Sequence, residues 1–194
     1  MNRGRPRQFN KEEALRSAML VFWRNGYRGT SLDDLTEALN INRPSLYAAF
    51  GDKEKLFLDS VDYYRDQFMV PTALALLEAD DLREGLDRFF RGFLNLVLGK
   101  ETPPGCFAAC LLSEECCDSS AIKDKLAALI SGADRAFTKA FERHQSVLRA
   151  PLTPEQAGKL LTSTIHGLAV RARAGGSKAE ILAVCKSFTD SLVK

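Results

Sequence analysis

Apolar residues recur at helical spacing along almost the whole chain. In residues 10–25, Leu15, Ala18, Met19 and Phe22 follow the i, i+3, i+4, i+7 pattern of a helix with one buried stripe. No segment shows the strict alternation of a half-buried strand. The pattern therefore predicts an all-α fold of nine helices, over residues 10–25, 32–39, 43–50, 53–78, 82–98, 106–116, 121–147, 154–174 and 178–192.

The segment 31–50 has the signals of two short helices around a tight turn. Ser31 precedes Asp34 by three residues, which is the spacing of a capping box with Asp in place of Glu. Asn42 is a favourable N-cap for the second helix, and Pro44 falls where its missing N–H has no helical partner to lose. The segment is therefore predicted to form a helix–turn–helix.

The second of these short helices has two distinct faces. Leu46 and Phe50 share an inner, apolar face. The opposite face carries Arg43, Pro44, Tyr47 and Ala48. A short helix with Arg and Tyr on its outer face fits a DNA major groove. The alternative is an ordinary solvated helix pair in an all-α protein.

Composition narrows the class of protein only modestly. The 194 residues carry a net charge of +2, which does not by itself indicate nucleic-acid binding. Arg3, Arg5 and Arg7 form a basic tip, interpreted either as a phosphate-binding arm or as a solvated end. No apolar stretch is long enough for a membrane span or a signal peptide, so a cytoplasmic protein that does not bind membranes is expected.

The five cysteines allow three interpretations. Cys106 and Cys110 are one helical turn apart, Cys116 and Cys117 are adjacent, and His166 is the histidine of the eighth helix. Packing in the core, sensing of oxidants or electrophiles, and metal binding all remain open. Adjacent cysteines chelate poorly, so no metal site is predicted. Because no nucleotide loop, paired carboxylates or Cys/His signature is present, we expect no enzyme, catalytic residue or cofactor.

Several motifs in residues 10–58 occur together in one known family. They are Gly-Tyr at 26–27, Thr-Ser at 30–31 and the run INRPSLYAAFGDKEKLF from residue 41. With the nine-helix order, these residues resemble the tetracycline-repressor (TetR) family of bacterial transcription regulators. The segment GCFAACLL is similar to a Gly-Cys-Leu-Leu-type segment in one branch of that family. The resemblance implies a homodimer, a palindromic double-stranded DNA operator and a small-molecule effector bound by the larger domain.

Carried onto this chain, the family pattern implies a division into two domains. Residues 1–52 would form the DNA-binding domain, and residues 53–194 the ligand-binding and dimerisation domain. Thr30 or Ser31, and Lys53, would contact phosphate, while the outer face of the recognition helix would enter the major groove. The complete predicted DNA-binding set is Arg5, Thr30, Ser31, Asn42, Arg43, Pro44, Ser45, Tyr47, Ala48 and Lys53.

The larger domain carries two further predicted sites. Aromatic residues at helical spacing either form core or line an apolar pocket. The predicted ligand-binding residues are Tyr64, Phe68, Phe93, Phe107, Cys110, Phe137 and His166. Small residues in the last two helices permit close approach of a second subunit. The predicted dimer-interface residues are Leu161, Ile165, Leu168, Ala172, Ile181, Cys185 and Phe188.

The expected function is a ligand-responsive transcriptional regulator. It would bind its operator as a dimer, act as a repressor, and be released by a small apolar or aromatic effector. A thiol-based sensor of oxidants or electrophiles with the same fold is the alternative. The sequence does not identify the operator, the effector or the regulated genes.

Overall fold

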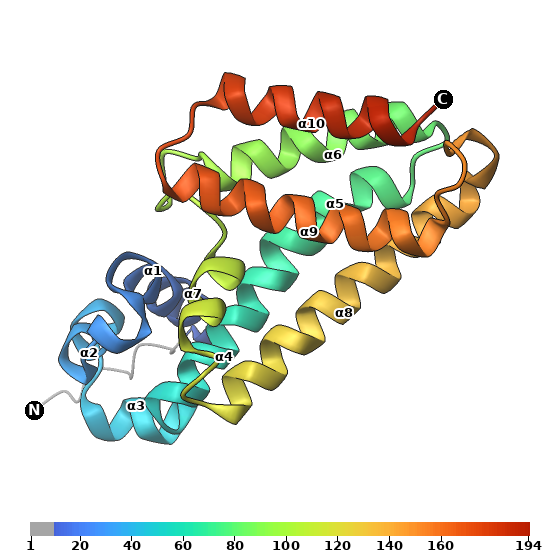
Figure 1. Ribbon diagram of the computed structural model, residues 1–194. Helices are drawn as coiled ribbons and strands as arrows, with labels where there is room; N and C mark the ends of the chain where they lie inside the picture. Colours follow the sequence, from blue (N-terminus) through green and yellow to red (C-terminus); the bar gives the residue numbers. More distant parts are fainter. Residues whose placement is uncertain (1–9) are drawn as a thin grey trace, which may run out of the picture. The chain divides into compact units, whose positions relative to one another are not determined.

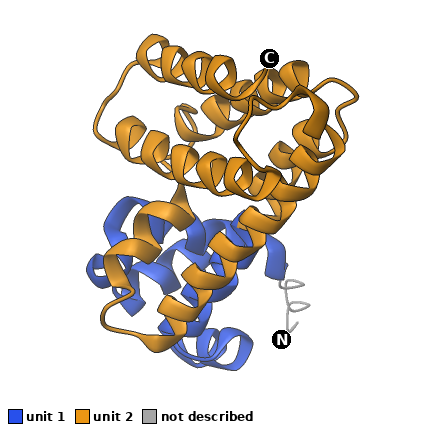
Figure 2. Cartoon of the chain, turned by 45° about the vertical axis from the view of Figure 1, so that its right-hand side comes forward, with its two compact units in different colours: residues 1–64 blue, residues 65–194 orange. Residues whose placement is uncertain are grey.

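The computed structural model describes residues 10–194, which divide after Tyr64 into two compact units (Figure 1, Figure 2). Helices account for nearly all the regular structure in the described part of the chain. If the continuous helical run 53–77 is counted as one helix, residues 10–194 contain nine main helices and one short 3₁₀ turn. The all-α, nine-helix prediction is therefore confirmed.

The first unit is built from α1 (Lys11–Gly29), α2 (Leu32–Leu39), α3 (Arg43–Phe50) and α4 (Lys53–Tyr64). Aromatic side chains hold α1 against α4. Phe22 meets Phe57 edge to face with ring centroids 5.2 Å apart, and Trp23 meets Tyr64 in the same way at 5.3 Å. Such pairs add to the free energy of burying the rings.

α1 is interrupted near its end, directly after residues 10–25, over which the sequence predicts the first helix. Gly26 has a positive φ of 73° and leaves the helical conformation, and one more turn follows. Tyr27 then packs back on Phe22 and Phe57. A glycine takes this backbone conformation without the cost that a Cβ atom would add.

The fourth predicted helix is one run that changes its geometry. α4 continues into a π-helical segment, η1 (Arg65–Met69), and then into α5 (Val70–Leu77). Pro71 lies in the first turn of α5, two residues after the end of the π-helical segment. The compact units divide after Tyr64, because α4 packs on α1. The functional boundary after residue 52 stays a prediction.

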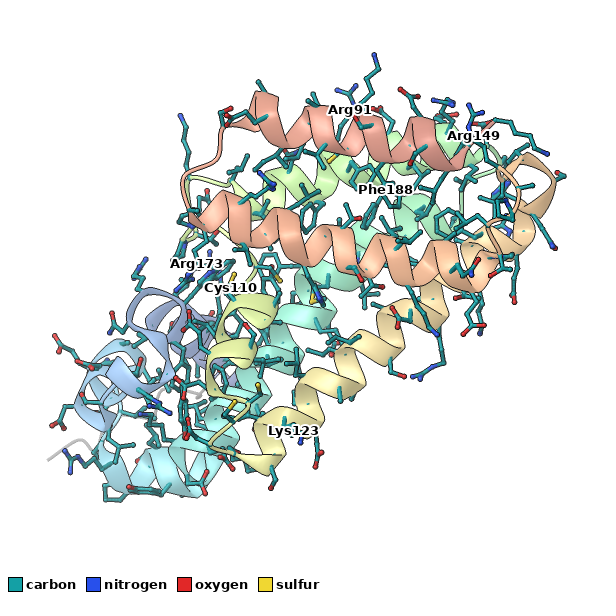
Figure 3. The ribbon with its side chains drawn as sticks, in the orientation of Figure 1. Arg91, Cys110, Lys123, Arg149, Arg173 and Phe188 are labelled. Atoms are coloured by element: carbon teal, nitrogen blue, oxygen red, sulfur yellow. The ribbon has the colours of Figure 1, made fainter. Side chains whose placement is uncertain are left out.

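The second unit adds α6 (Leu82–Val97), α7 (Phe107–Glu115), α8 (Ser120–Arg143), η2 (Gln145–Val147), α9 (Pro154–Arg173) and α10 (Lys178–Leu192). α10 lies beside α6 and α9 (Figure 1). Phe188 of α10 points inward (Figure 3). Its ring meets that of Phe90 of α6 edge to face, with ring centroids 5.7 Å apart. α8 ends at Arg143, four residues earlier than predicted.

α8 and α9 approach each other closely at Gly158. A Cβ atom at that position would lie 2.7 Å from Thr138 Oγ1 and 2.8 Å from Thr138 N. Only glycine fits there without a shift of the backbone. Over residues 10–194, none of the helices has the length and apolar character needed to cross a membrane.

Candidate nucleic-acid interface and effector cavity

Local hydrogen bonds fix the two helices of the helix–turn–helix. Ser31 Oγ accepts from the backbone N–H of Asp34 at 3.1 Å, and Asp34 Oδ2 accepts from the Ser31 N–H at 2.8 Å. This capping box confirms the one expected from the sequence. The hydrogen bond from the Ser31 amide lowers the pKa of Asp34. In the turn, Asn40 adopts the left-handed conformation with φ 51°.

α3 begins as predicted. Asn42 Oδ1 accepts from the Ser45 N–H at 2.9 Å, and Pro44 lies in the first turn. Leu46 and Phe50 are fully buried, in agreement with their predicted inner face. These contacts hold the short helix in place from its N-terminal end and its inner face.

The outer face of α3 is exposed. Tyr47 is 48% exposed, which is unusual for a large aromatic residue. The exposed set on this face is Arg43, Pro44, Ser45, Tyr47 and Ala48. The structure thus brings together on one accessible surface the residues predicted to enter the major groove. Asn42, also exposed, uses its side chain as the helix cap.

Arg43 is paired within the protein. Its Nε and Nη2 both donate to Asp33 Oδ1, at 3.1 Å and 2.8 Å. The pair joins α2 to α3, and both side chains are more than half exposed. The hydrogen bond with Asp33 raises the pKa of Arg43 above its ordinary value. The sequence gives no signal of this role of Asp33, because Asp33 and Arg43 lie ten positions apart on different helices.

Two predicted phosphate contacts look different in the structure. Thr30 is a correction: its side chain is 1% exposed and its hydroxyl donates to Gly26 O at 2.7 Å, so it stabilises the end of α1. Ser31 remains exposed. The Lys53 ammonium lies 4.5 Å from the centroid of the Tyr27 ring. Lys53 is the first residue of α4, and this cation–π contact holds its side chain over Tyr27. Arg5 lies outside the described residues.

The second unit contains a cavity of about 660 Å³. Its wall comes from η1 and α5 to α9 and is largely apolar, with Phe89, Phe93 and Phe137 among the aromatic residues. Arg65, Asp124, Lys125 and His166 are among its polar residues. A volume of this size suits a small organic molecule.

Three of the seven predicted ligand residues line this cavity, namely Phe93, Phe137 and His166. The other four, which are Tyr64, Phe68, Phe107 and Cys110, do not line this cavity, and a role in ligand binding for them stays a prediction. Tyr64 packs on Trp23 in the first unit, and Phe107 is fully buried in the core. Helical spacing identified these side chains as apolar but could not separate core from cavity wall.

A stripe of small residues was the missed signal for this cavity. Ala121, Ala128, Gly132 and Ala136 recur at helical spacing on α8, and all four line the cavity. Small side chains leave space that larger ones would fill. The spacing of the aromatic residues alone does not reveal this space.

Cys106, rather than Cys110, contributes a thiol to the cavity wall. Its Sγ accepts from the Ala109 N–H at 3.5 Å at the start of α7. Cys110 is buried, and Arg173 lies near it (Figure 3). Burial raises the pKa of Cys110, and burial raises the pKa of Cys185 to about 11. Both therefore remain thiols at neutral pH.

His166 is held in its neutral form. Burial lowers the pKa of His166, and the opposing effect of the Asp134 charge is smaller. A neutral imidazole offers one hydrogen-bond donor and one acceptor. Across residues 10–194, no group of three or more Cys, His, Asp and Glu side chains is arranged to hold a metal ion.

The structure does not favour the predicted set of dimer-interface residues. All seven are at most 9% exposed within a single subunit, so they offer a partner almost no side-chain surface. The opposite faces of α9 and α10 carry large apolar residues in exposed positions: Leu160, Val170, Leu182 and Val184. Val170 is 59% exposed, and Ser163 and Gly167 lie exposed between it and Leu160. We call Leu160, Val170, Leu182 and Val184 the apolar stripe.

Comparisons with known proteins agree with a DNA-binding helix–turn–helix. Residues 14–59 match the family described as "Bacterial regulatory proteins, tetR family". The HTH-type transcriptional repressor ComR of Escherichia coli K12 is 31% identical over 188 residues, covering 94% of this chain and 89% of ComR. BdcR, another E. coli repressor, is 41% identical over 70 residues, or 36% of each chain.

Solved structures show the same fold. A cysteine mutant of the TetR family regulator CifR, complexed with 26-bp double-stranded operator DNA, has a TM-score of 0.83 and 32% identity, covering 96% of this chain and 99% of that one. Reduced E. coli NemR has a TM-score of 0.81 at 18% identity, covering 94% of this chain and 96% of that one, and supports the fold alone. The helix–turn–helix and the all-α second unit define a regulator of this class. The chain belongs to the TetR family.

Proposed function

We propose that this protein is a transcriptional repressor that binds an inverted-repeat DNA operator through α3. The observation that carries the proposal is the exposed outer face of α3, which presents Arg43 and Tyr47. The N-terminus of this helix is capped and its inner face is buried. The repressor ComR and the operator-bound CifR support it by likeness. An Arg fork matches guanine O6 and N7, and a Tyr hydroxyl reaches phosphate.

In vitro selection from random duplexes tests this function. The expected result is an inverted repeat whose half-sites lie about one helical turn apart, ~34–36 Å. Binding of random duplex without selection of any sequence would contradict the proposal. A reporter gene placed behind the selected site then separates repression from activation.

The proposal includes a homodimer joined through α9 and α10. The apolar stripe supports it, because large exposed apolar residues on adjacent helices favour a symmetric contact with a second copy. Ser163 and Gly167, between Leu160 and Val170, leave room for close helix approach. Light scattering at micromolar concentration should give the mass of a dimer, and a folded monomer would contradict it.

The effector proposed for the cavity is a small, uncharged apolar or aromatic molecule. The largely apolar and aromatic wall, together with the neutral His166, supports such a ligand. Binding should weaken operator affinity by about 1–3 kcal/mol, the usual scale of allosteric coupling. A screen that finds tight ligands, none of which changes DNA affinity, would contradict this step.

A thiol-based response is a second candidate, favoured by the position of Cys106 in the cavity wall. The Ala109 amide points at its sulfur and would stabilise a thiolate. In a conjugate addition, the Cys106 thiol first loses its proton to solvent. The thiolate then bonds to the β-carbon of an unsaturated carbonyl compound, whose C=C π bond breaks and whose α-carbon takes up a proton. Cys106→Ser should abolish release of DNA by an electrophile, and the exposed Cys117→Ser should retain it. Equal responses of both variants would contradict this candidate.

A further inference from the structure

The pairing of Asp33 with Arg43 leaves one edge of the guanidinium available. Nε and Nη2 form one edge and both donate to Asp33 Oδ1. The other edge, formed by Nη1 and Nη2, meets no acceptor among residues 10–194. This second edge is itself a two-donor fork, the shape that reads guanine O6 and N7.

We propose that Asp33 is a positioning residue for DNA reading, which holds Arg43 so that its Nη1–Nη2 edge faces a guanine. The inference rests on the proposed function, since it requires α3 to lie in the major groove. Arg43 comes from the first turn of α3 and Asp33 from the first turn of α2. Each helix is capped, by Asn42 and Ser31 respectively, so both partners project from fixed backbone.

The charge of Asp33 also disfavours contacts between Arg43 and the phosphates of DNA. A free arginine binds any phosphate, which adds affinity without sequence information. A carboxylate beside the guanidinium repels phosphate and occupies the donors that would reach it. Loss of Asp33 should therefore raise affinity for random DNA while lowering the preference for guanine. Higher affinity for random DNA combined with a weaker preference for guanine would show that Asp33 positions Arg43. A residue that only contributes to affinity would change the binding of all sequences alike.

Asp33→Asn is the appropriate change, because it keeps the shape of the side chain and removes its charge. The matched control is Glu37→Gln, one turn further along α2 on the same face, which also removes one exposed negative charge. Glu37 has no side-chain contact with Arg43 in the described residues. Thermal melting should show that both variants fold.

The measurement is equilibrium binding to three duplexes. They are the selected operator, the operator with the pair read by Arg43 replaced symmetrically, and a scrambled sequence. The pair is identified as the position whose preference is lost on selection with Arg43→Ala. Asp33→Asn should lower the preference for that pair by roughly two- to five-fold per half-site, the factor expected of an exposed ion pair. Glu37→Gln should raise affinity for all three duplexes alike.

The double variant Asp33→Asn with Arg43→Ala completes the test. If Asp33 acts through Arg43, adding Asp33→Asn to Arg43→Ala should leave the remaining base preferences unchanged. The inference is overturned if Asp33→Asn and Glu37→Gln change the three affinities by the same factors. It is also overturned if Arg43→Ala keeps the full preference while the protein still selects a site. Failure of the wild-type protein to select any site would instead overturn the proposed function.

Discussion

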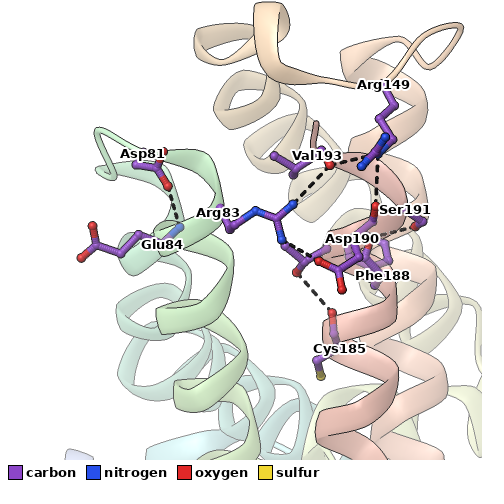
Figure 4. Close-up of polar contacts among 10 residues, drawn as sticks. Asp81, Arg83, Glu84, Arg149, Cys185, Phe188, Asp190, Ser191 and Val193 are labelled. Carbon is purple, nitrogen blue, oxygen red and sulfur yellow. Dashed lines mark hydrogen bonds and ion pairs between the residues drawn. The ribbon is translucent and has the colours of Figure 1, made fainter.

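Arg83 Nη1 donates to Asp190 Oδ1 at 2.6 Å and joins the first turn of α6 to the last turn of α10 (Figure 4). The same guanidinium also donates to Val193 O, which accepts from Arg149 Nε as well. Two positive charges thus meet the carbonyl end of α10, where the helix dipole favours them. This contact bridges residues that lie more than a hundred positions apart.

Arg83→Ala should therefore lower stability slightly more than Arg91→Ala. Arg91 is also on α6 and pairs with Asp87 at 2.7 Å, but within one helix. Both pairs are about half exposed or more, so the ion pairs themselves contribute little to stability. The additional loss in Arg83→Ala comes from the bond to Val193 O. Urea unfolding compares the two variants, and equal midpoints would contradict the role of this contact.

Gly158→Ala should destabilise the second unit. The new Cβ would meet the Thr138 backbone at 2.8 Å, which costs about 1–3 kcal/mol when a packed helix pair must shift. Gly132→Ala on α8 is the control, because nothing lies within 4 Å of its Cβ position. That substitution should stabilise the helix by up to about 1 kcal/mol. Thermal melting of both variants should shift in opposite directions.

Val170→Asp should separate the subunits without unfolding them. Val170 is 59% exposed in a single subunit, so a charge there is costly only against a partner. Phe188→Asp differs, because Phe188 packs on Phe90 in the core and its replacement should unfold the second unit. Light scattering and circular dichroism separate the two outcomes. A dimeric Val170→Asp variant would place the interface elsewhere.

Stability should fall at mildly acidic pH because of His166. Burial lowers the pKa of His166 below its ordinary value of 6.5, so the unfolded chain binds a proton before the folded one. The full stability is present above pH 6.5. It is lost as the pH falls from there through the lowered pKa of His166 in the folded state. His166→Gln should lose less stability than wild type between about pH 7.5 and 5.5. Urea titrations at both pH values with parallel losses would contradict this assignment.

Lys53→Ala should weaken binding to operator and scrambled DNA by the same factor. An ammonium that contacts phosphate adds affinity without sequence preference, so the slope of log affinity against log salt should fall by about one per subunit. The variant also loses the cation–π contact with Tyr27, so its melting temperature must be checked. A change confined to the operator would show that Lys53 contributes to base reading.

The sequence predicted elements whose signals are local. The capping box of Ser31 and Asp34 and the N-cap Asn42 appear where expected, because each depends on residues three positions apart. The inner residues Leu46 and Phe50 were also identified correctly. Such signals need no knowledge of the neighbouring helices.

The sequence does not show which faces of the helices pack in the core of their own subunit. Leu160 and Leu161 are adjacent and equally apolar, but Leu161 is fully buried and Leu160 is 46% exposed. Periodicity shows that α9 has two apolar faces and cannot say which one meets its own core. Similarly, Cys106 and Cys110 are one turn apart, and only packing places Cys106 at the cavity. These choices are made by long-range contacts.

The π-helical segment Arg65–Met69 keeps one wall of the cavity straight. Arg65, Met69, Ala73 and Leu77 all line the cavity and recur every four residues. In a regular α-helix, such a row turns by about 40° at each step and would wind away from the cavity. A π turn contains more residues than an α turn, so each residue rotates the chain by a smaller angle. This offsets part of the rotation of the row and keeps these side chains facing the cavity. Deleting one residue here would restore α geometry and rotate the rest of the row by about 100°.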